Sequence, residues 1–360
     1  MRFSLCMIVK NEEKTLERCL ESVKGIFDEI IIVDTGSLDN TKATAKKYTD
    51  KIYDFIWCDD FSLARNFSFS KASGDYIMWL DADDIIDDKN ANKLLDLKEK
   101  LSFDTDVVMM KYATGFDETG NETFFYYRER LIKKFSGLKW NGFVHEVITP
   151  KGNVVYEDIT VFHKPDNKKQ KDPARNLKMY ESKLASGAKL SARETYYFAR
   201  ELYYNGKYDK ASKYFEEFLS FPNGWYVDKI NACTILYDIY IQFSVNKAIS
   251  ALAKALSYDI VNPQVLCLMG DAQKISCRLD QAIFWYSSAL LCPPSYRQNG
   301  FVMPEYERYY PLLQLCVCYD MLGEYDKAKE YNRLAGIEKP DSEAVKLNEK
   351  YFEEKIKPAE

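Results

Sequence analysis

The sequence predicts an α/β domain with a mainly parallel sheet, followed by an all-α domain built from helical repeats. Three observations support this order. Short apolar, β-branched runs alternate with amphipathic segments in the first third of the chain. After about residue 165 the pattern becomes almost wholly helical. A frame of Ala, aromatic, Leu and Pro then returns at near-regular spacing. With 360 residues, the chain has room for two domains of ordinary size.

Four apolar runs predict the strands of the first domain, at residues 3–9, 30–33, 76–80 and 106–110. Continuous runs separated by helical segments are typical of a parallel sheet covered on both faces. In such a sheet, ligands bind beyond the carboxyl ends of the strands. Asp34 and Asp81 directly follow two of these runs, so we expect both side chains to face one shared crevice.

The second half contains a repeat that begins at Ala211, Ala248, Ala282 and Ala328. In the two clearest copies an aromatic residue follows three positions on, a Leu eight on and a Pro eleven on. The 34 residues from Ala248 to Ala282 are the period of the tetratricopeptide repeat, in which a small Ala lets two antiparallel helices approach. Four degenerate repeats are expected, and an unrelated helical bundle is the alternative. The expected boundaries are 1–165 for the α/β domain, 166–190 for a linker and helix, and 191–360 for the repeats.

Charge and cysteine usage narrow the class of protein. The 50 Lys and Arg against 55 Asp and Glu give a net charge of -5, which disfavours a nucleic-acid partner. Nine cysteines without a CxxC pair indicate reduced thiols in a cytoplasmic protein. No apolar run approaches the ~18 residues of a membrane span, and the start lacks the pattern of a signal peptide. We therefore expect a cytoplasmic protein without stable membrane insertion.

A dense acidic patch follows the third predicted strand, in the segment YIMWLDADDIIDD. An Asp-x-Asp at a strand end can hold Mg²⁺ or Mn²⁺ bridging to substrate phosphates. A phosphatase of the haloacid type has the same tripeptide and would use Asp81 as a nucleophile, so the tripeptide alone does not decide between the two. Asp84 is expected to support a metal site, and Asp87 and Asp88 are expected to start a helix.

The sequence resembles glycosyltransferase family 2, with its GT-A nucleotide-sugar-binding fold, in four blocks that occur in order: SLCMIVKNEE, IIVDTGSLDNT, FSLARNFSFSKASGDYIMWLDADD and LKWNGFVHEVI. The blocks span roughly residues 3–165. The repeats that follow narrow the resemblance to bacterial members that carry tetratricopeptide repeats. Among these, the S-glycosyltransferases of sublancin-type bacteriocins look similar.

The resemblance implies how a UDP-sugar and a divalent ion would bind. Asp83 would ligate Mn²⁺ or Mg²⁺ on the diphosphate, and His163 resembles the late His that reaches the metal or the diphosphate. A residue at a domain edge is the alternative for His163, and an exposed helix face is the alternative for Arg175. Nucleotide-sugar contacts are implied for Val9, Glu12, Asp34, Arg65, Asp81, Ala82 and Arg175.

The same resemblance places the general base in the block WNGFVHEVI, where the family uses an acidic residue. Glu146 is the expected base, because its carboxylate could take the proton from the acceptor as the nucleophile attacks. His145 is the rival base, and a purely structural role for Glu146 is the other alternative.

Together these features predict a metal-dependent inverting glycosyltransferase that moves a hexose or N-acetylhexosamine from a UDP-sugar to Ser, Thr or Cys of a polypeptide. The repeats would hold the acceptor, or pair two copies of the chain, because stacked helix pairs form a concave surface. A saccharide or lipid-linked acceptor is the competing enzyme hypothesis. A non-catalytic repeat scaffold with a degenerate transferase domain is the third.

Overall fold

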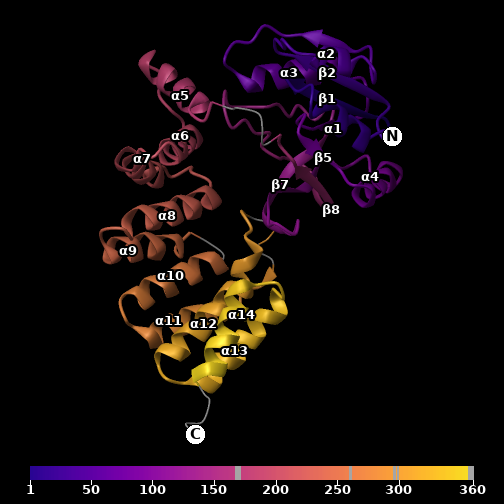
Figure 1. Ribbon diagram of the computed structural model, residues 1–360. Coiled ribbons are helices and arrows are strands. Elements are labelled where there is room, and N and C mark those ends of the chain that lie inside the picture. Colours follow the sequence, from indigo (N-terminus) through magenta and orange to yellow (C-terminus); the bar gives the residue numbers. More distant parts are fainter. Residues whose placement is uncertain (167–171, 259–261, 295–296, 298–299, 356–360) are drawn as a thin grey trace. The chain divides into compact units, whose positions relative to one another are not determined.

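The computed structural model describes residues 1–166, 172–258, 262–294, 297 and 300–355, and it divides into two compact units, Met1–Ala188 and Lys189–Glu360 (Figure 1). Each unit is described by itself. Residues 167–171 of the expected linker lie outside the described residues. The expected domain boundaries at residues 165 and 191 stay a prediction.

The first unit is built on an eight-stranded sheet with the order β3-β2-β1-β4-β7-β6-β8-β5. Parallel pairs join β3 to β2, β2 to β1, β1 to β4 and β6 to β8, whereas β7 and β5 pair with antiparallel neighbours. All four predicted apolar runs form strands, so the mainly parallel α/β class is confirmed. The strands are β1 (Phe3–Val9), β2 (Glu29–Asp34), β3 (Ile52–Asp54), β4 (Tyr76–Trp79), β5 (Asp84–Ile85), β6 (Val107–Phe116), β7 (Glu122–Lys133) and β8 (Val154–His163).

Both faces of this sheet are buried, because side chains alternate between two cores. On β4, Tyr76 and Met78 join the core that contains residues of α1 and α4, whereas Ile77 and Trp79 point to cores lined in part by residues of α3. The helices of the unit are α1 (Leu16–Ser22), α2 (Thr41–Ala45), α3 (Phe61–Lys71), α4 (Asp88–Lys100) and α5 (Arg175–Ala185). Asp87 caps α4 by accepting the N–H of Asn90, as predicted for the end of the acidic patch.

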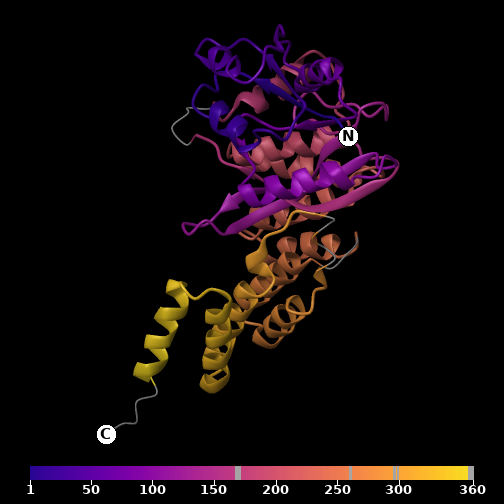
Figure 2. The same cartoon turned by 90° about the vertical axis from the view of Figure 1, so that its right-hand side faces the viewer.

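The second unit is helical (Figure 2), and from α6 to α13 its helices follow one another in pairs along the chain. Ala211, Ala248, Ala282 and Ala328 are each fully buried at the fourth residue of the second helix of a pair. The alanine frame therefore marks the helix pairs correctly, and the helical class is confirmed. The helices are α6 (Ala192–Tyr204), α7 (Tyr208–Ser220), α8 (Tyr226–Tyr240), α9 (Val245–Ala255), α10 (Pro263–Ile275), α11 (Leu279–Ala289), α12 (Tyr309–Met321), α13 (Tyr325–Glu338) and α14 (Glu343–Lys355), with a 3-10 turn at Pro304–Tyr306.

Close packing within the third pair depends on one glycine. A Cβ atom at Gly270 of α10 would lie 2.5 Å from the ring of Tyr286 on α11, so the two helices approach too closely for any larger residue. The turns between paired helices use a left-handed backbone at Gly206, Cys277 and Gly323. None of the helices in the described ranges is long and apolar enough to cross a membrane.

Candidate active site

The carboxyl ends of β1 and β2 lie side by side, because Val9 faces Asp34 in the parallel register. Asp34 Oδ1 accepts the N–H groups of Gly36 and Ser37, each at 2.9 Å, which orients the carboxylate at the strand end. Its Oδ2 is buried and has no hydrogen-bond partner among the residues that the structure describes. A buried acceptor without a partner is costly, so this oxygen suits an N–H group of a bound molecule.

The loops after β1 and β2 are tied to each other. Glu12 donates its backbone N–H to Thr41 Oγ1 at 2.7 Å, and its carboxylate accepts the hydroxyl of Thr15 at 2.8 Å. Asn11, in a left-handed conformation, accepts the N–H of Leu38 on its side-chain oxygen at 2.8 Å. The structure thus brings three of the predicted nucleotide-sugar residues, Val9, Glu12 and Asp34, to one edge of the sheet.

Arg65 of α3 is at the centre of the site and is only 7% exposed. Its guanidinium donates to Asp81 Oδ1 at 2.7 Å and to Glu146 Oε1 at 2.6 Å. It also lies over the rings of Trp79 and Trp140, with distances of 4.9 and 4.8 Å to the ring centroids. One buried cation therefore joins a residue predicted to contact the donor to the residue predicted to be the base.

Asp81 is ionised at neutral pH. Burial by itself would raise the pKa of its carboxyl group, but the positive charges of Arg65 and Arg130 and the hydrogen bond from Arg65 outweigh burial and lower that pKa to about 2. The carboxylate can therefore act as a hydrogen-bond acceptor for a hydroxyl group of a ligand. Ala82, the next residue, is buried at the same strand end.

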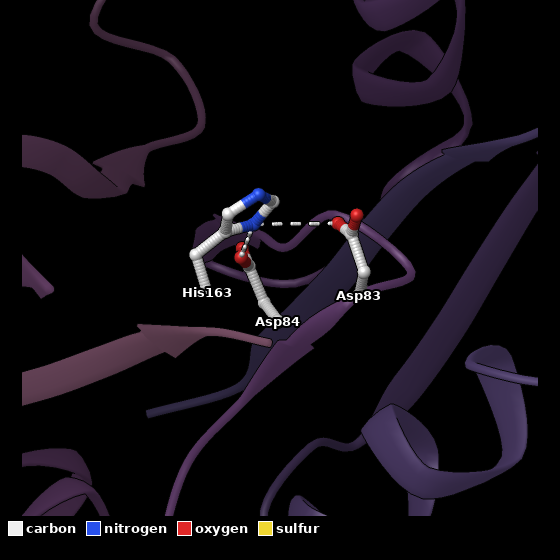
Figure 3. Close-up of side chains that lie close together, drawn as sticks. All are labelled: Asp83, Asp84 and His163. Atoms are coloured by element: carbon white, nitrogen blue, oxygen red, sulfur yellow. Dashed lines mark ion pairs between the residues drawn. The ribbon is translucent and has the colours of Figure 1, made fainter. Parts of the chain in front are cut away.

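Asp83, Asp84 and His163 form the cluster that could hold a metal ion, with candidate ligand atoms all within 4.8 Å of one another. The antiparallel pairing of β5 with β8 sets Asp84 opposite His163. Figure 3 shows the imidazole facing both carboxylates, and Nδ1 lies 3.5 Å from an oxygen of each. Burial would lower the pKa of His163, but the hydrogen bond to Asp84 and the charges of the nearby aspartates raise it overall.

Asp84 is already engaged by other groups of the protein. It accepts from Arg130 at 3.0 Å, from the Tyr112 hydroxyl at 2.9 Å and from the backbone N–H of Asp81 at 3.0 Å. Arg130 is fully buried, with its guanidinium 3.8 Å from the ring centroid of Trp79 and 4.2 Å from that of Tyr112. Asp84 thus helps to fix the loop, and Nδ1 of His163 lies 3.1 Å from the same Tyr112 hydroxyl. The expected supporting role of Asp84 stays a prediction. Carboxylate oxygen and imidazole nitrogen together suit Mn²⁺, and the oxygen suits Mg²⁺.

Arg130 reaches this position through a β-bulge. In the pairing of β6 with β7, Val108 faces Leu131 and Met109 faces Glu129, so Arg130 is the extra residue in β7. Bulges often redirect a side chain next to a functional site. No motif in the sequence marked Arg130 or Tyr112, because a bulge changes the alternation of side chains only once the two strands are paired.

The loop from Trp140 to Ile148 carries the predicted base. Asn141 and Val147 exchange backbone hydrogen bonds of 2.9 and 3.0 Å, which closes the loop. Within it, His145 has a φ of 54°, a left-handed conformation that is uncommon outside glycine. The Glu146 side chain is 11% exposed and points to Arg65. The choice between Glu146 and His145 as base stays a prediction.

Arg175 begins α5 and is exposed. Its guanidinium lies over the ring of Phe61, the first residue of α3, at 5.1 Å from the centroid, and donates to the side chain of Asn176. These contacts place it beside the helix that carries Arg65. Its predicted contact with the donor phosphates stays a prediction.

A mainly parallel sheet with an acidic cluster at the carboxyl ends of its strands is typical of an α/β domain that binds a ligand at that edge. Residues 4–158, somewhat less than half of the chain, match the family model "Glycosyl transferase family 2".

Three curated relatives illustrate the similarity. The SPbeta prophage-derived glycosyltransferase SunS of Bacillus subtilis (strain 168) is 29% identical over 225 residues, 59% of this chain and 51% of that protein. The TPR repeat-containing protein Synpcc7942_0270 of Synechococcus elongatus is 52% identical over 81 residues, 22% of this chain and 20% of that protein. The lipopolysaccharide core biosynthesis glycosyltransferase LpsC of Rhizobium meliloti is 30% identical over 162 residues, 42% of this chain and 57% of that protein. The chain thus spans about half or less of the length of the first relatives.

Solved structures are more distant. S. aureus TarS 1-349 is 14% identical, with a TM-score of 0.36 over 80% of this chain and 91% of that chain. Glucosyl-3-phosphoglycerate synthase from Mycobacterium tuberculosis is 22% identical, with a TM-score of 0.28 over 31% of this chain and 44% of that chain.

Proposed function

We propose that the protein is a metal-dependent inverting glycosyltransferase that moves a hexose or N-acetylhexosamine from a UDP-sugar to a polypeptide acceptor. The observation that carries this proposal is the pair of bonds from Arg65 to Asp81 and Glu146, beside the Asp83 and His163 cluster. A donor-side carboxylate and a candidate base are therefore parts of one connected site. The match to the family 2 model supports the same reaction class.

On the donor side, the uracil N–H of UDP would donate to Asp34 Oδ2, the buried acceptor that lacks a partner among the described residues. Asp81 would accept a ribose hydroxyl. Asp83 and His163 would hold Mn²⁺ or Mg²⁺, and the bound cation would neutralise negative charge that develops on the leaving diphosphate. Arg175 would approach the same phosphates from the start of α5.

On the acceptor side, the hydroxyl of Ser or Thr, or the thiol of Cys, would lose its proton to Glu146 as its oxygen or sulfur attacks the anomeric carbon. The new bond forms on the face opposite the leaving group while the bond from that carbon to the diphosphate oxygen breaks. UDP leaves with the electron pair, and the configuration inverts. One displacement needs one base, which fits a single carboxylate held at 2.6 Å from Arg65. His145 is the rival for this role.

The repeat unit is the proposed holder of the acceptor or of a second copy of the chain. Consecutive helix pairs, each closed at a buried alanine, form the stacked architecture that binds extended polypeptides. The similarity to a TPR repeat-containing protein supports this assignment of the second half.

A screen of donors tests the proposed reaction. UDP-glucose, UDP-GlcNAc, UDP-galactose and UDP-GalNAc are each incubated with Mn²⁺ and wild-type protein, and released UDP is measured. We expect slow, metal-dependent release from one donor, lost on chelation and in Asp83→Ala. Asp96→Ala is the matched control, because Asp96 is an exposed aspartate of α4, with its side chain 71% exposed. No release from any donor, with or without metal, would overturn the proposal.

A saccharide acceptor is the second candidate, favoured by the similarity to LpsC. Once the donor is known, the labelled sugar is offered with peptides containing Ser, Thr or Cys and, in parallel, with oligosaccharides. Label on peptide alone supports a polypeptide acceptor. Label on oligosaccharide alone assigns the saccharide reaction instead.

A further inference from the structure

Helix α3 holds the loop of the predicted base at three separate points. The N–H of Phe61 donates to the carbonyl of Phe143 at 2.9 Å. The side-chain amide of Asn66 donates to the carbonyl of Trp140 at 2.9 Å and accepts the N–H of Trp140 at 3.0 Å. Arg65 then binds the carboxylate of Glu146 at 2.6 Å. Helix and loop are far apart in the sequence, so these contacts are tertiary.

We propose that Asn66 is a positioning residue for Glu146, acting together with Arg65. This inference rests on the proposed function, because it gives Asn66 a part in the same reaction. Among the described residues, the hydrogen bonds of the Asn66 side chain go to Trp140 rather than to Glu146 or to the cluster of Asp83, Asp84 and His163. Asn66 acts by fixing the backbone at the start of the loop from which Glu146 projects.

The geometry of the Asn66 contact suits this role. One side-chain amide both donates to and accepts from the same residue, which fixes the rotation of the Trp140 backbone as well as its distance from α3. A single hydrogen bond would leave that rotation free. The contacts with α3 therefore fix the position of the loop segment that follows Trp140.

Trp140 transmits this position to the charged groups. Its side chain is 2% exposed, its ring packs edge-on against Trp79 at 5.0 Å between centroids, and its face supports the guanidinium of Arg65. If Trp140 shifts, the cation that binds Glu146 loses one wall of its pocket. Asn66 thus controls both the loop and the counter-ion of the base.

The loop also needs an external anchor. His145, directly before Glu146, has a left-handed backbone with a φ of 54°, and such a conformation persists only where surrounding contacts enforce it. Removing the Asn66 contacts should let this residue relax toward an ordinary conformation, which would swing the neighbouring carboxylate away from Arg65.

The test compares Asn66→Ala, Asn66→Asp and wild type in two measurements. Hydrogen exchange of the Asn141 and Val147 amides, which close the loop, reports its anchoring without any turnover. UDP release from the active donor reports kcat and the donor KM. Ser70→Ala is the matched control, because Ser70 is exposed on the same helix and bonds only to the carbonyl of Phe67.

We expect faster exchange of both amides in Asn66→Ala and a kcat lower by about a hundredfold, with donor KM unchanged, since a small misplacement of a catalytic group has effects of that size. Asn66→Asp keeps the acceptor for the Trp140 N–H, so its exchange rates and its kcat should lie between those of wild type and those of Asn66→Ala. A general loss of fold would instead lower the unfolding midpoint and affect KM as well.

Unchanged exchange in Asn66→Ala would overturn the inference whatever the activity. Faster exchange with unchanged kcat would also overturn it, because the loop would be anchored without orienting a base. Absence of UDP release in wild type would count against the proposed function, while the exchange data would still decide whether Asn66 anchors the loop.

Discussion

Asp81 and Glu146 share the guanidinium of Arg65, at 2.7 and 2.6 Å. One carboxylate follows the strand that leads to the candidate metal cluster, and the other projects from the loop beyond β7. Their separation is therefore set by a rigid, planar cation that donates to Glu146 through Nε and to Asp81 through Nη2. Any change at Arg65 should affect both sides of the site together.

Arg65→Lys should lower UDP release by at least about a hundredfold, because one ammonium group cannot hold two carboxylates in the geometry of a guanidinium. The positive charge is kept, so the protein should still fold, as a thermal unfolding scan would check. Steady-state kinetics with the active donor measure the effect. Activity within a few-fold of wild type would contradict a bridging role.

The side chains of Asp83 and His163 should be needed for Mn²⁺ binding but not for folding. Asp83→Asn and His163→Ala should each weaken Mn²⁺ binding, measured by calorimetry in the presence of UDP, by at least about tenfold. Their unfolding midpoints should change little. Asp84→Asn should instead destabilise the protein, because it leaves the fully buried Arg130 without its charged partner. If Asp83→Asn and His163→Ala both bound Mn²⁺ with the affinity of wild type, the cluster would be excluded as the metal site.

Glu29 should make the first unit less stable in acid. Its buried carboxylate accepts from the Ser4 and Ser73 hydroxyls and from the Gly74 N–H, and it pairs with Lys51. Burial would raise the pKa of Glu29, but these contacts lower it to about 2 from the ordinary 4.5. The stabilisation is therefore complete above about pH 4.5 and is lost as the pH falls toward 2, and its size is at most about 3 kcal/mol.

Urea unfolding of wild type and Glu29→Gln tests this. The difference in unfolding free energy should be largest at pH 7 and should shrink at pH 3. A difference that is the same at both values would show that the charge of Glu29 does not contribute.

Gly270→Ala should destabilise the repeat unit by about 1–3 kcal/mol, because the added Cβ meets the Tyr286 ring at 2.5 Å. Gly336→Ala on α13 is the matched control, since the added Cβ would meet a Val345 methyl at 3.1 Å and alanine favours a helix. Chemical unfolding measures both. Equal stability of the two variants would mean that α10 and α11 can separate without cost.

Cys277→Gly should stabilise the same unit by up to about 1 kcal/mol. Cys277 is exposed and has a φ of 56° at the turn where two other pairs have glycine. Ser276→Gly is the control and should destabilise, because Ser276 has an ordinary φ of -83°. Glycine there adds freedom to the unfolded chain and removes the bond from the Ser276 hydroxyl to the Ala272 carbonyl. If Cys277→Gly were less stable than wild type, the packing of the Cys277 side chain would have to stabilise the fold by more than the strain at this residue costs.

Much of the first unit could be predicted because its central strands are continuous apolar runs. The edge and hairpin strands could not, since β7 carries Arg128, Glu129 and Arg130 in succession and has no simple alternation. Burial of such residues becomes clear only when their partners are known. The repeats were predictable for the opposite reason: a small residue at fixed spacing reports a local contact between consecutive helices.

The site residues that lie at strand ends could be predicted from the sequence. The contacts between residues far apart in the sequence could not. Asp34 and Asp81 follow from the rule for parallel sheets. The role of Arg65 was expected to be contact with the nucleotide, yet its guanidinium binds two carboxylates of the protein. Nothing in the local spacing of the block around Arg65 and Asn66 indicates a loop that follows much later in the chain.

The bulge at Arg130 makes the site unusually sensitive to the length of one strand. Deleting this single residue would let Leu131 and Glu129 become neighbours in a regular ladder, so we expect the sheet to survive. The guanidinium that holds Asp84 would be lost. A change of one codon would therefore separate inheritance of the fold from inheritance of the candidate site, and it offers a short evolutionary route to a chain that keeps the sheet and loses the site.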